Sequence, residues 1–179
     1  MINIQKGRFE PLLTKRSIDK RIDELAKDIN IQFKNENPIF IGVLNGSFIF
    51  LSDLLRKIEI DCEVDFIKVA SYKGKISTNK ITTSIKLSRN LKNRHVIIVE
   101  DIIDTGATLK FLLKYFKTMK PSKITVIALL HKPESLKNKL KIDYIGFEIS
   151  PDFVVGYGLD YNQKFRNLDS IYHLKELEK

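Results

Sequence analysis

Three carboxylates and a glycine turn lie close together in the stretch VEDIIDTGATL, residues 99–109. Glu100, Asp101 and Asp104 would repel a polyanion, but carboxylates bind hydroxyl groups and metal ions well. Gly106 stands just before an expected helix start, where free backbone amides and the helix dipole attract phosphate. A ligand that suits this combination carries a phosphate at one end and hydroxyls or a metal ion at the other. A ribose 5-phosphate has this chemistry.

A buried strand and an amphipathic helix are predicted to position this turn. Residues 96–99 (VIIV) are β-branched and predict a parallel strand that ends near Glu100. A helix is predicted to begin near Thr108, because apolar residues then recur at helical spacing: Leu109, Leu112, Leu113 and Phe116. The stretch lacks the glycine-rich patterns of nucleoside-triphosphate and dinucleotide loops, which disfavours those ligands. The alternative interpretation is a solvated acidic strand end followed by a capped helix.

The rest of the chain alternates between helical and strand patterns. A helix with Ser17 as its N-cap is predicted over residues 18–33, and a second helix follows the turn at 45–47 and runs to residue 55. Strands are predicted at residues 39–44, 64–70, 81–87, 124–130 and 144–149. The turn at 45–47 joins a strand to a helix start, so it is a second candidate anion site, although an ordinary connecting turn explains it as well.

The composition indicates one globular domain over residues 1–179, since 43% hydrophobic residues supply one core. The net charge of +9 raises the question of nucleic acid or membrane partners, but the lysines are dispersed, as on a solvated surface. Cys62 is the only cysteine, so no internal disulfide can form and a reducing compartment is expected. The first residues lack an apolar signal core, and the longest uncharged run is shorter than a membrane span. We expect a soluble cytoplasmic protein.

The stretch VEDIIDTGATL closely resembles the phosphoribosyl-diphosphate (PRPP) signature of type I phosphoribosyltransferases, and its EDIIDTG form is similar to that of the hypoxanthine-guanine members. The resemblance implies that Glu100 and Asp101 bind the ribose of PRPP. It also implies a 5-phosphate site made by Asp104, Thr105, Gly106, Ala107 and Thr108. In the family, the aspartate that Asp104 matches is the general base for the proton of the attacking purine nitrogen.

Two further loops match the family in the same order along the chain. The match LNGS implies that Leu44, Asn45 and Gly46 bind pyrophosphate through backbone amides. The family often has Lys or Arg at the position of Asn45, so this chain lacks a charged side-chain contact there, and it commonly has a cis peptide between residues 44 and 45. Ser71 and Tyr72 match a pair on a flexible loop that closes over the active site. Without the resemblance, the polar residues after them predict a mobile surface hairpin.

The purine base is expected to bind near the C-terminal part of the chain. Lys132 matches a lysine that donates to the purine 6-oxo group, although alone it would be interpreted as a solvated strand end. Phe153 matches an aromatic residue that stacks on the purine, and the backbone of Val154 would meet ring position 2. Asp160 matches a residue of the purine site that also binds Mg²⁺, usually through water, and Arg166 matches a pyrophosphate-binding arginine. In isolation, Asp160 and Arg166 would be interpreted as a surface ion pair.

The resemblance implies an α/β fold with an open, mostly parallel twisted sheet flanked by helices, and a small additional subdomain from the chain ends. The implied reaction transfers the phosphoribosyl group of PRPP to a 6-oxopurine, hypoxanthine and also guanine, giving IMP or GMP and pyrophosphate. Mg²⁺ is the implied cofactor, with Glu100, Asp101 and Asp160 as its ligands. The expected partners are these substrates and further copies of the chain, as a dimer or tetramer, without nucleic acid or membrane. Two alternatives are an RNA-binding regulator on the same fold and a transferase for another base.

Overall fold

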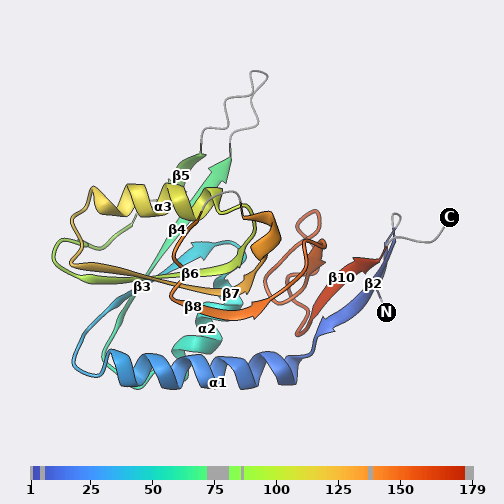
Figure 1. The fold of residues 1–179 in the computed structure, drawn as a ribbon, viewed down its shortest axis with the longest axis horizontal. Coiled ribbons are helices and arrows are strands. Elements are labelled where there is room, and N and C mark those ends of the chain that lie inside the picture. Colours follow the sequence, from blue (N-terminus) through green and yellow to red (C-terminus); the bar gives the residue numbers. More distant parts are fainter. Residues whose placement is uncertain (1, 5–6, 72–80, 86, 137–138, 176–179) are drawn as a thin grey trace.

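The main sheet contains the strands that carry the predicted site. The computed structural model describes residues 2–4, 7–71, 81–85, 87–136 and 139–175. The sheet has the strand order β5-β4-β3-β6-β7-β8, and β5 is antiparallel to β4 while the other pairs are parallel (Figure 1). The strands are β3 (Ile39–Leu44), β4 (Glu63–Ser71), β5 (Ile81–Ile85), β6 (His95–Ile103), β7 (Lys123–His131) and β8 (Tyr144–Glu148). Their parallel arrangement brings the carboxyl ends of β3, β6 and β7 to one edge, where ligands of open α/β sheets bind.

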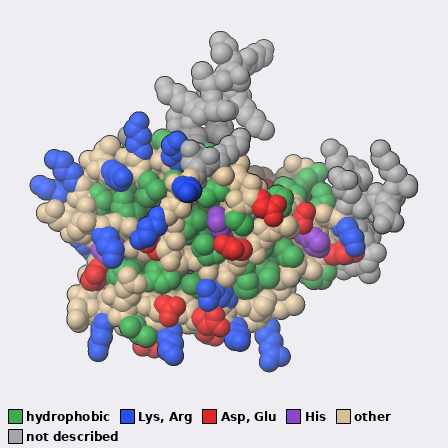
Figure 2. Space-filling model, in the orientation of Figure 1, with side chains coloured by type: hydrophobic (Ala, Val, Ile, Leu, Met, Phe, Trp, Pro, Cys, Tyr) green, Lys and Arg blue, Asp and Glu red, His purple; other side chains and the backbone are tan. Residues whose placement is uncertain are grey.

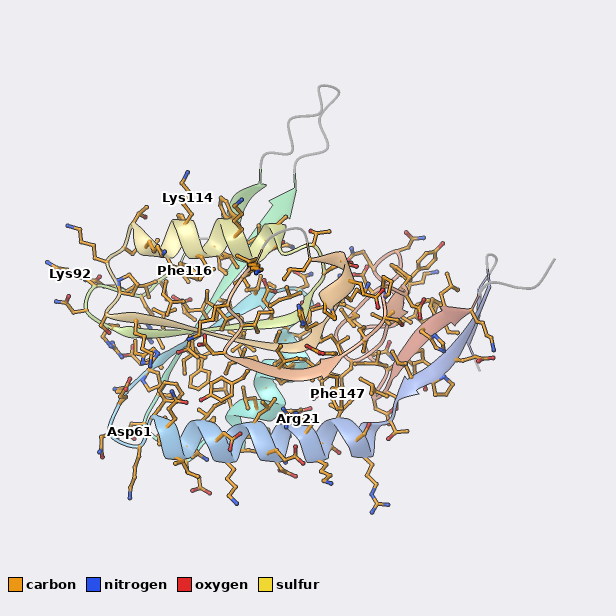
Figure 3. The ribbon with its side chains drawn as sticks, viewed as in Figure 1. Arg21, Asp61, Lys92, Lys114, Phe116 and Phe147 are labelled. Carbon is orange, nitrogen blue, oxygen red and sulfur yellow. The ribbon has the colours of Figure 1, made fainter. Side chains whose placement is uncertain are left out.

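Helices cover both faces of the main sheet (Figure 1). The helices α1 (Lys15–Gln32) and α2 (Phe48–Leu55) lie on one face, and α3 (Ala107–Lys117) lies on the other. Each face therefore has its own apolar core, one around α1 and α2 and one around α3. Figure 3 shows Phe116 pointing from α3 toward the sheet, while Lys114 points away from it. This two-sided burial explains why the central strands are almost continuously hydrophobic.

A second, smaller sheet is built from the chain ends. It has the order β1-β2-β10-β9, formed by β1 (Ile2–Ile4), β2 (Gly7–Leu13), β9 (Val154–Val155) and β10 (Ile171–Lys175), and its pairs are antiparallel. The segment between β9 and β10 leads back toward the ligand edge of the main sheet. The predicted fold class, including the subdomain from the chain ends, is confirmed.

Several predicted boundaries were wrong. The strand expected to stop near Glu100 continues to Ile103, because Glu100 and Ile102 still pair with β7. The first helix begins at Lys15 and is capped by Thr14, whose Oγ1 accepts a hydrogen bond from the N–H of Ser17 at 3.2 Å. The predicted N-cap, Ser17, therefore lies inside the helix. Strand β5 ends at Ile85, two residues short of the predicted end.

Arg21 of α1 donates from Nε to the carbonyl of Gly146 at 3.0 Å and from Nη2 to that of Ile145 at 2.8 Å, which fixes α1 against β8 (Figure 3).

On the face shown in Figure 2, Lys and Arg side chains are distributed among acidic ones. Within the described residues, no helix combines the length and the apolar character needed to cross a bilayer.

Candidate active site

A cavity of about 370 Å³ opens at the carboxyl ends of β3 and β6. Its lining brings together most of the predicted phosphate and metal residues, although the first and the last of them, Leu44 and Arg166, are more than 120 positions apart in the chain. These are Leu44, Asn45, Gly46, Glu100, Asp101, Asp104, Thr105, Gly106, Ala107, Thr108, Asp160 and Arg166. Sequence reasoning missed its apolar wall, which includes Val43 and Val69. Strand residues such as these carry no signal that separates a cavity wall from the core.

The turn that follows β6 has the geometry of an anion site. Gly106 adopts φ 76° and is the N-cap of α3, and as a glycine it contributes no side-chain cap. Thr105 Oγ1 lies 3.5 Å from the backbone nitrogen of Ala107, which donates to it. The α3 start thus combines a left-handed glycine with a helix dipole directed at the cavity. The helix begins one residue before the predicted position near Thr108.

The Cα of Gly106 faces two leucine side chains. A Cβ atom there would lie 2.7 Å from Leu140 Cδ1 and 2.8 Å from Leu136 Cδ1, so it would point at these two leucines. Replacing Gly106 with Val is expected to weaken PRPP binding strongly, because a β-branched residue is strained at this positive φ and the turn must move to relieve the strain, even if the two leucine side chains shift aside. The KM for PRPP and direct PRPP titration measure the effect. Unchanged PRPP affinity in a folded variant would contradict the assignment of this turn to phosphate.

The two adjacent carboxylates of β6 lie in a desolvated environment. Glu100 is 4% exposed, and burial followed by the charge of Asp101 raises its pKa well above the ordinary value. Burial also raises the pKa of Asp101 to about 6, although backbone hydrogen bonds and Arg166 oppose this shift. Both groups are costly to ionise in the free protein. Hydroxyls or a cation from a ligand would relieve that cost.

This desolvation predicts a pH dependence of stability. Since the folded protein holds the Asp101 proton more tightly than the unfolded chain, the stability that this proton provides is present below about pH 4 and is lost as the pH rises through about 6. Replacing Asp101 with Asn should remove this loss and raise the free energy of unfolding at pH 7.5 by roughly 2–3 kcal/mol. Urea unfolding of both proteins at pH 4.5 and 7.5 measures it. Equal pH dependence in the two proteins would show that Asp101 ionises freely.

The loop after β3 is held tightly against Asp101. A cis peptide joins Leu44 to Asn45, as the resemblance led us to expect. A Cβ atom on Gly46 would lie 1.5 Å from Asp101 Oδ2, so any side chain at this position would displace the Asp101 carboxylate. Ser47 is fully buried and its hydroxyl donates to the carbonyl of Val43 at 2.7 Å, which closes the turn before α2. The Asn45 side chain is exposed and has no charge to offer a ligand.

The segment between β9 and β10 supplies the opposite wall of the cavity. Arg166 Nη2 lies 2.6 Å from Asp160 Oδ1, and its Nη1 donates to the carbonyl of Gly158 at 2.7 Å. Asp160 Oδ2 also accepts from the backbone N–H of Gln163 at 2.8 Å. The two residues do form the ion pair that the sequence suggested, but the pair lines the cavity.

Of the residues expected to bind the base, Asp160 lines the cavity, whereas Lys132, Phe153 and Val154 are not part of its described lining. Lys132 follows β7, is 5% exposed, and donates from Nζ to Asp104 Oδ2 at 3.2 Å. Phe153 is 46% exposed, and its ring meets the ring of Tyr161 edge-on with centroids 5.9 Å apart. Val154 is buried and pairs with β10. Lys132 is thus connected to the cavity through Asp104, and almost half of the Phe153 surface is open to solvent.

The pair expected on the flexible loop lies where β4 ends. Ser71 ends β4, and Tyr72 lies outside the described residues.

His131, interpreted from the sequence as structural, is buried at the end of β7, with Nδ1 3.4 Å from Glu148 Oε1.

The sequence reasoning also missed a contact between α2 and the opposite wall. The hydroxyl of Tyr157 donates to Asp53 Oδ2 at 2.5 Å, across 104 positions of the chain. Asp53 is the one charged residue in α2 (FIFLSDLL), and a charge in so apolar a helix was the available signal. Its partner could not be identified without the fold.

The acidic residues do not form a closed metal cage. Within the described part of the chain, no group of three or more His, Cys, Asp or Glu side chains is arranged to hold a metal ion. Nevertheless Glu100, Asp101 and Asp160 all line the cavity. Mg²⁺ commonly keeps several waters and binds one or two carboxylates together with substrate phosphates. The donor set therefore fits a metal ion that enters with a phosphate-bearing ligand.

Comparison with known proteins gives matches over nearly the whole chain. A phosphoribosyl transferase domain model matches residues 10–162. The chain is 39% identical over 169 residues to hypoxanthine phosphoribosyltransferase of Buchnera aphidicola subsp. Schizaphis graminum, which covers 93% of this chain and 96% of that relative. It is 38% identical over 165 residues to hypoxanthine-guanine phosphoribosyltransferase of Bacillus subtilis, with 92% of each protein covered.

Solved structures share the fold as well. The chain superposes with a TM-score of 0.89 on a hypoxanthine-guanine phosphoribosyltransferase from Bacillus anthracis, at 38% identity, with 95% of this chain and all of the other covered. A hypoxanthine phosphoribosyltransferase from Trypanosoma cruzi in complex with its product IMP gives a TM-score of 0.88 at 32% identity, with 98% of each chain covered.

Proposed function

The chain belongs to the phosphoribosyl transferase domain family, and from this premise we propose that it is a purine salvage enzyme. It transfers the 5-phosphoribosyl group from PRPP to a 6-oxopurine, hypoxanthine and also guanine, giving IMP or GMP and pyrophosphate. The observation that carries the proposal is the single cavity in which the carboxylates of β6, the α3 start, the loop after β3 and Arg166 converge. PRPP presents a phosphate, two ring hydroxyls and a pyrophosphate. The α3 start suits the phosphate, the carboxylates of β6 suit the hydroxyls, and the loop after β3 with Arg166 suits the pyrophosphate.

PRPP is proposed to lie across the carboxyl ends of β3 and β6. The turn at 104–108 holds the 5-phosphate at the start of α3, while Glu100 and Asp101 accept hydrogen bonds from the ribose hydroxyls. The backbone of Leu44, Asn45 and Gly46 binds the pyrophosphate, with Arg166 on the opposite side. Cleavage at C1 leaves positive charge on the sugar and negative charge on the departing pyrophosphate. These charges face the carboxylates and Arg166 respectively, which stabilises the transition state.

The purine is proposed to bind beside Asp104. The buried ammonium group of Lys132 donates to the 6-oxo oxygen, Phe153 stacks on the ring, and the backbone of Val154 together with Asp160 meets the position-2 side of the base. A 6-amino group would place a donor against the Lys132 donor, which disfavours adenine. Asp104, already within reach of Lys132, accepts the proton that the attacking purine nitrogen loses.

Mg²⁺ is the proposed cofactor, with Glu100, Asp101 and Asp160 as the residues that hold it, directly or through water. When bound, the ion neutralises the pyrophosphate as it leaves C1. Glu100, Asp101 and Asp160 would supply the negative charge that holds the ion, and Arg166, paired with Asp160, would add positive charge for the pyrophosphate.

We also propose that the protein works in the cytoplasm as a homo-oligomer, a dimer or tetramer, without nucleic acid or membrane partners. The lone thiol, Cys62, suits a reducing compartment. Phe48 of α2 and Phe66 of β4 are 43% and 38% exposed, a large apolar exposure that a second copy could cover. Sedimentation analysis measures the oligomeric state. Residues 1–179 are taken as a single catalytic domain.

A base panel tests the proposal directly. Purified protein is incubated with PRPP, Mg²⁺ and one of hypoxanthine, guanine, xanthine or adenine, and nucleotide products are identified by mass spectrometry. We expect IMP and GMP to form, and AMP to be absent. Turnover with adenine alone would favour a transferase for another base, and no turnover with any base would overturn the proposal.

A further inference from the structure

The segment between Phe153 and Arg166 is bent sharply at Tyr157. Three successive residues, Gly156, Tyr157 and Gly158, have φ values of 97°, 51° and 99°. Tyr157 is a non-glycine residue in the left-handed region, and its side chain is 4% exposed in the core shared with α1 and α2. The bend separates the proposed base-binding part of the segment from Asp160 and Arg166. A fixed bend is therefore required for these residues to face the cavity.

One hydrogen bond attaches this bend to α2. The Tyr157 hydroxyl donates to Asp53 Oδ2 at 2.5 Å. Burial and the Asp53 carboxylate raise the pKa of Tyr157 strongly, so its hydroxyl stays protonated and remains a donor. Because α2 begins at Phe48, directly after the loop that follows β3, Asp53 is rigidly connected to that loop.

A second contact lies next to the first. The backbone of Gly158 approaches the loop so closely that a Cβ atom on it would be 2.0 Å from the carbonyl oxygen of Gly46. The carbonyl of Gly158 accepts from Arg166 Nη1 at 2.7 Å. The Tyr157–Asp53 bond and the Gly158–Gly46 contact therefore hold the two walls of the pyrophosphate half of the cavity at a fixed separation.

We propose that Tyr157 is a positioning residue for pyrophosphate: its hydrogen bond to Asp53 holds Asp160 and Arg166 opposite the loop at residues 44–46. This inference rests on the proposed function. It goes beyond a stabilising role, because the bond connects the two walls between which one substrate group binds. Loss of the bond should affect the PRPP and pyrophosphate ligands more than the purine.

The test is a set of matched variants measured for both substrates. Tyr157→Phe and Asp53→Ala are each expected to raise the KM for PRPP and the dissociation constant of Mg–pyrophosphate by roughly tenfold, the effect of one hydrogen bond to a charged acceptor. The KM for hypoxanthine should change less than about twofold. Asp53→Asn keeps an acceptor oxygen and should stay near the wild-type PRPP value. The double variant Tyr157→Phe/Asp53→Ala should resemble either single variant, since both remove the same bond.

Tyr144→Phe is the control for the loss of a tyrosine hydroxyl. Tyr144 lies on β8, and its hydroxyl donates to the side chain of Gln32 on α1, away from the cavity. Melting temperatures are recorded for every variant. If Tyr157→Phe has a lower melting temperature but a wild-type KM for PRPP and a wild-type dissociation constant for Mg–pyrophosphate, the bond only stabilises the fold. That result would overturn the inference. Equal losses for PRPP and hypoxanthine would overturn it too, and Asp53→Ala provides the same test if Tyr157→Phe does not fold.

The failure of the proposed function is distinguishable from the failure of this inference. Wild-type protein that makes no nucleotide contradicts the proposed function. Calorimetric titration of Mg–pyrophosphate into wild type and Tyr157→Phe then still decides whether the bond positions the two walls, because this measurement requires no turnover.

Discussion

Replacement of Asp104 with Asn is expected to lower kcat by roughly 10²- to 10⁴-fold while PRPP binding is largely kept. The purine nitrogen must lose a proton as it bonds to C1 of the ribose. Asn has nearly the shape of Asp and still accepts a hydrogen bond from Lys132, but it is not a base. The loss should therefore appear in the chemical step, and steady-state and single-turnover kinetics with hypoxanthine measure it.

The structure weakens the main alternative explanation for Asp104. An aspartate before a helix often caps it, and Asn would cap about as well. However, Gly106 is the N-cap of α3, the side chain that accepts from the N–H of Ala107 is that of Thr105, and Asp104 contacts Lys132 Nζ at 3.2 Å. A capping role therefore does not explain the position of this carboxylate.

Asp143→Asn is the matched control for this variant. Asp143 is also paired with a lysine, Lys141 at 2.6 Å, but it precedes β8 at the opposite edge of the sheet and accepts from the N–H of Val126. Its replacement should lower stability moderately and leave kcat near the wild-type value. Near-normal kcat in folded Asp104→Asn would show that the proton leaves by another route.

Removal of divalent cations is expected to abolish turnover, and added Mg²⁺ or Mn²⁺ should restore it. PRPP brings several negative charges next to Glu100, Asp101 and Asp160, and the leaving pyrophosphate cannot be stabilised by Arg166 alone. Product formation is measured in excess EDTA and then with Mg²⁺ in excess over the chelator. Full turnover in excess EDTA would contradict the assigned role of the metal.

The melting temperature of the free protein separates a catalytic metal from a structural one. Since no acidic or histidine cluster among the described residues forms a metal cage by itself, EDTA should not shift the melting temperature without PRPP. Mg²⁺ should raise the melting temperature mainly when PRPP or pyrophosphate is present. A large EDTA shift in the free protein would indicate a structural metal ion.

The sequence by itself determined the α/β class through its resemblance to the family, and the strands of the main sheet and the turn at Gly106 through local patterns. Local patterns were sufficient there: β-branched runs bounded by turns specify buried strands, and a glycine before a periodic apolar stretch specifies a helix start. The ends of elements were less certain. Strand β6 extends past Glu100 because pairing with β7 offsets the poor strand preference of carboxylates, and Thr14 caps α1 because its own oxygen reaches the N–H of Ser17. Where a strand or helix ends therefore depends on contacts with other residues, and a local sequence pattern does not show these contacts.

Only the tertiary structure decided which distant residues touch. Lys132 reaches Asp104 across 28 positions and Tyr157 reaches Asp53 across 104, so no spacing rule connects them. The close approach of the Gly158 backbone to the Gly46 backbone depends on the separation of packed segments, which is set by the whole core. The same packing withdraws Glu100 and Asp101 from water and raises the pKa of each. Residue types specify which groups are available for chemistry, but their distances and charges depend on the fold that surrounds them.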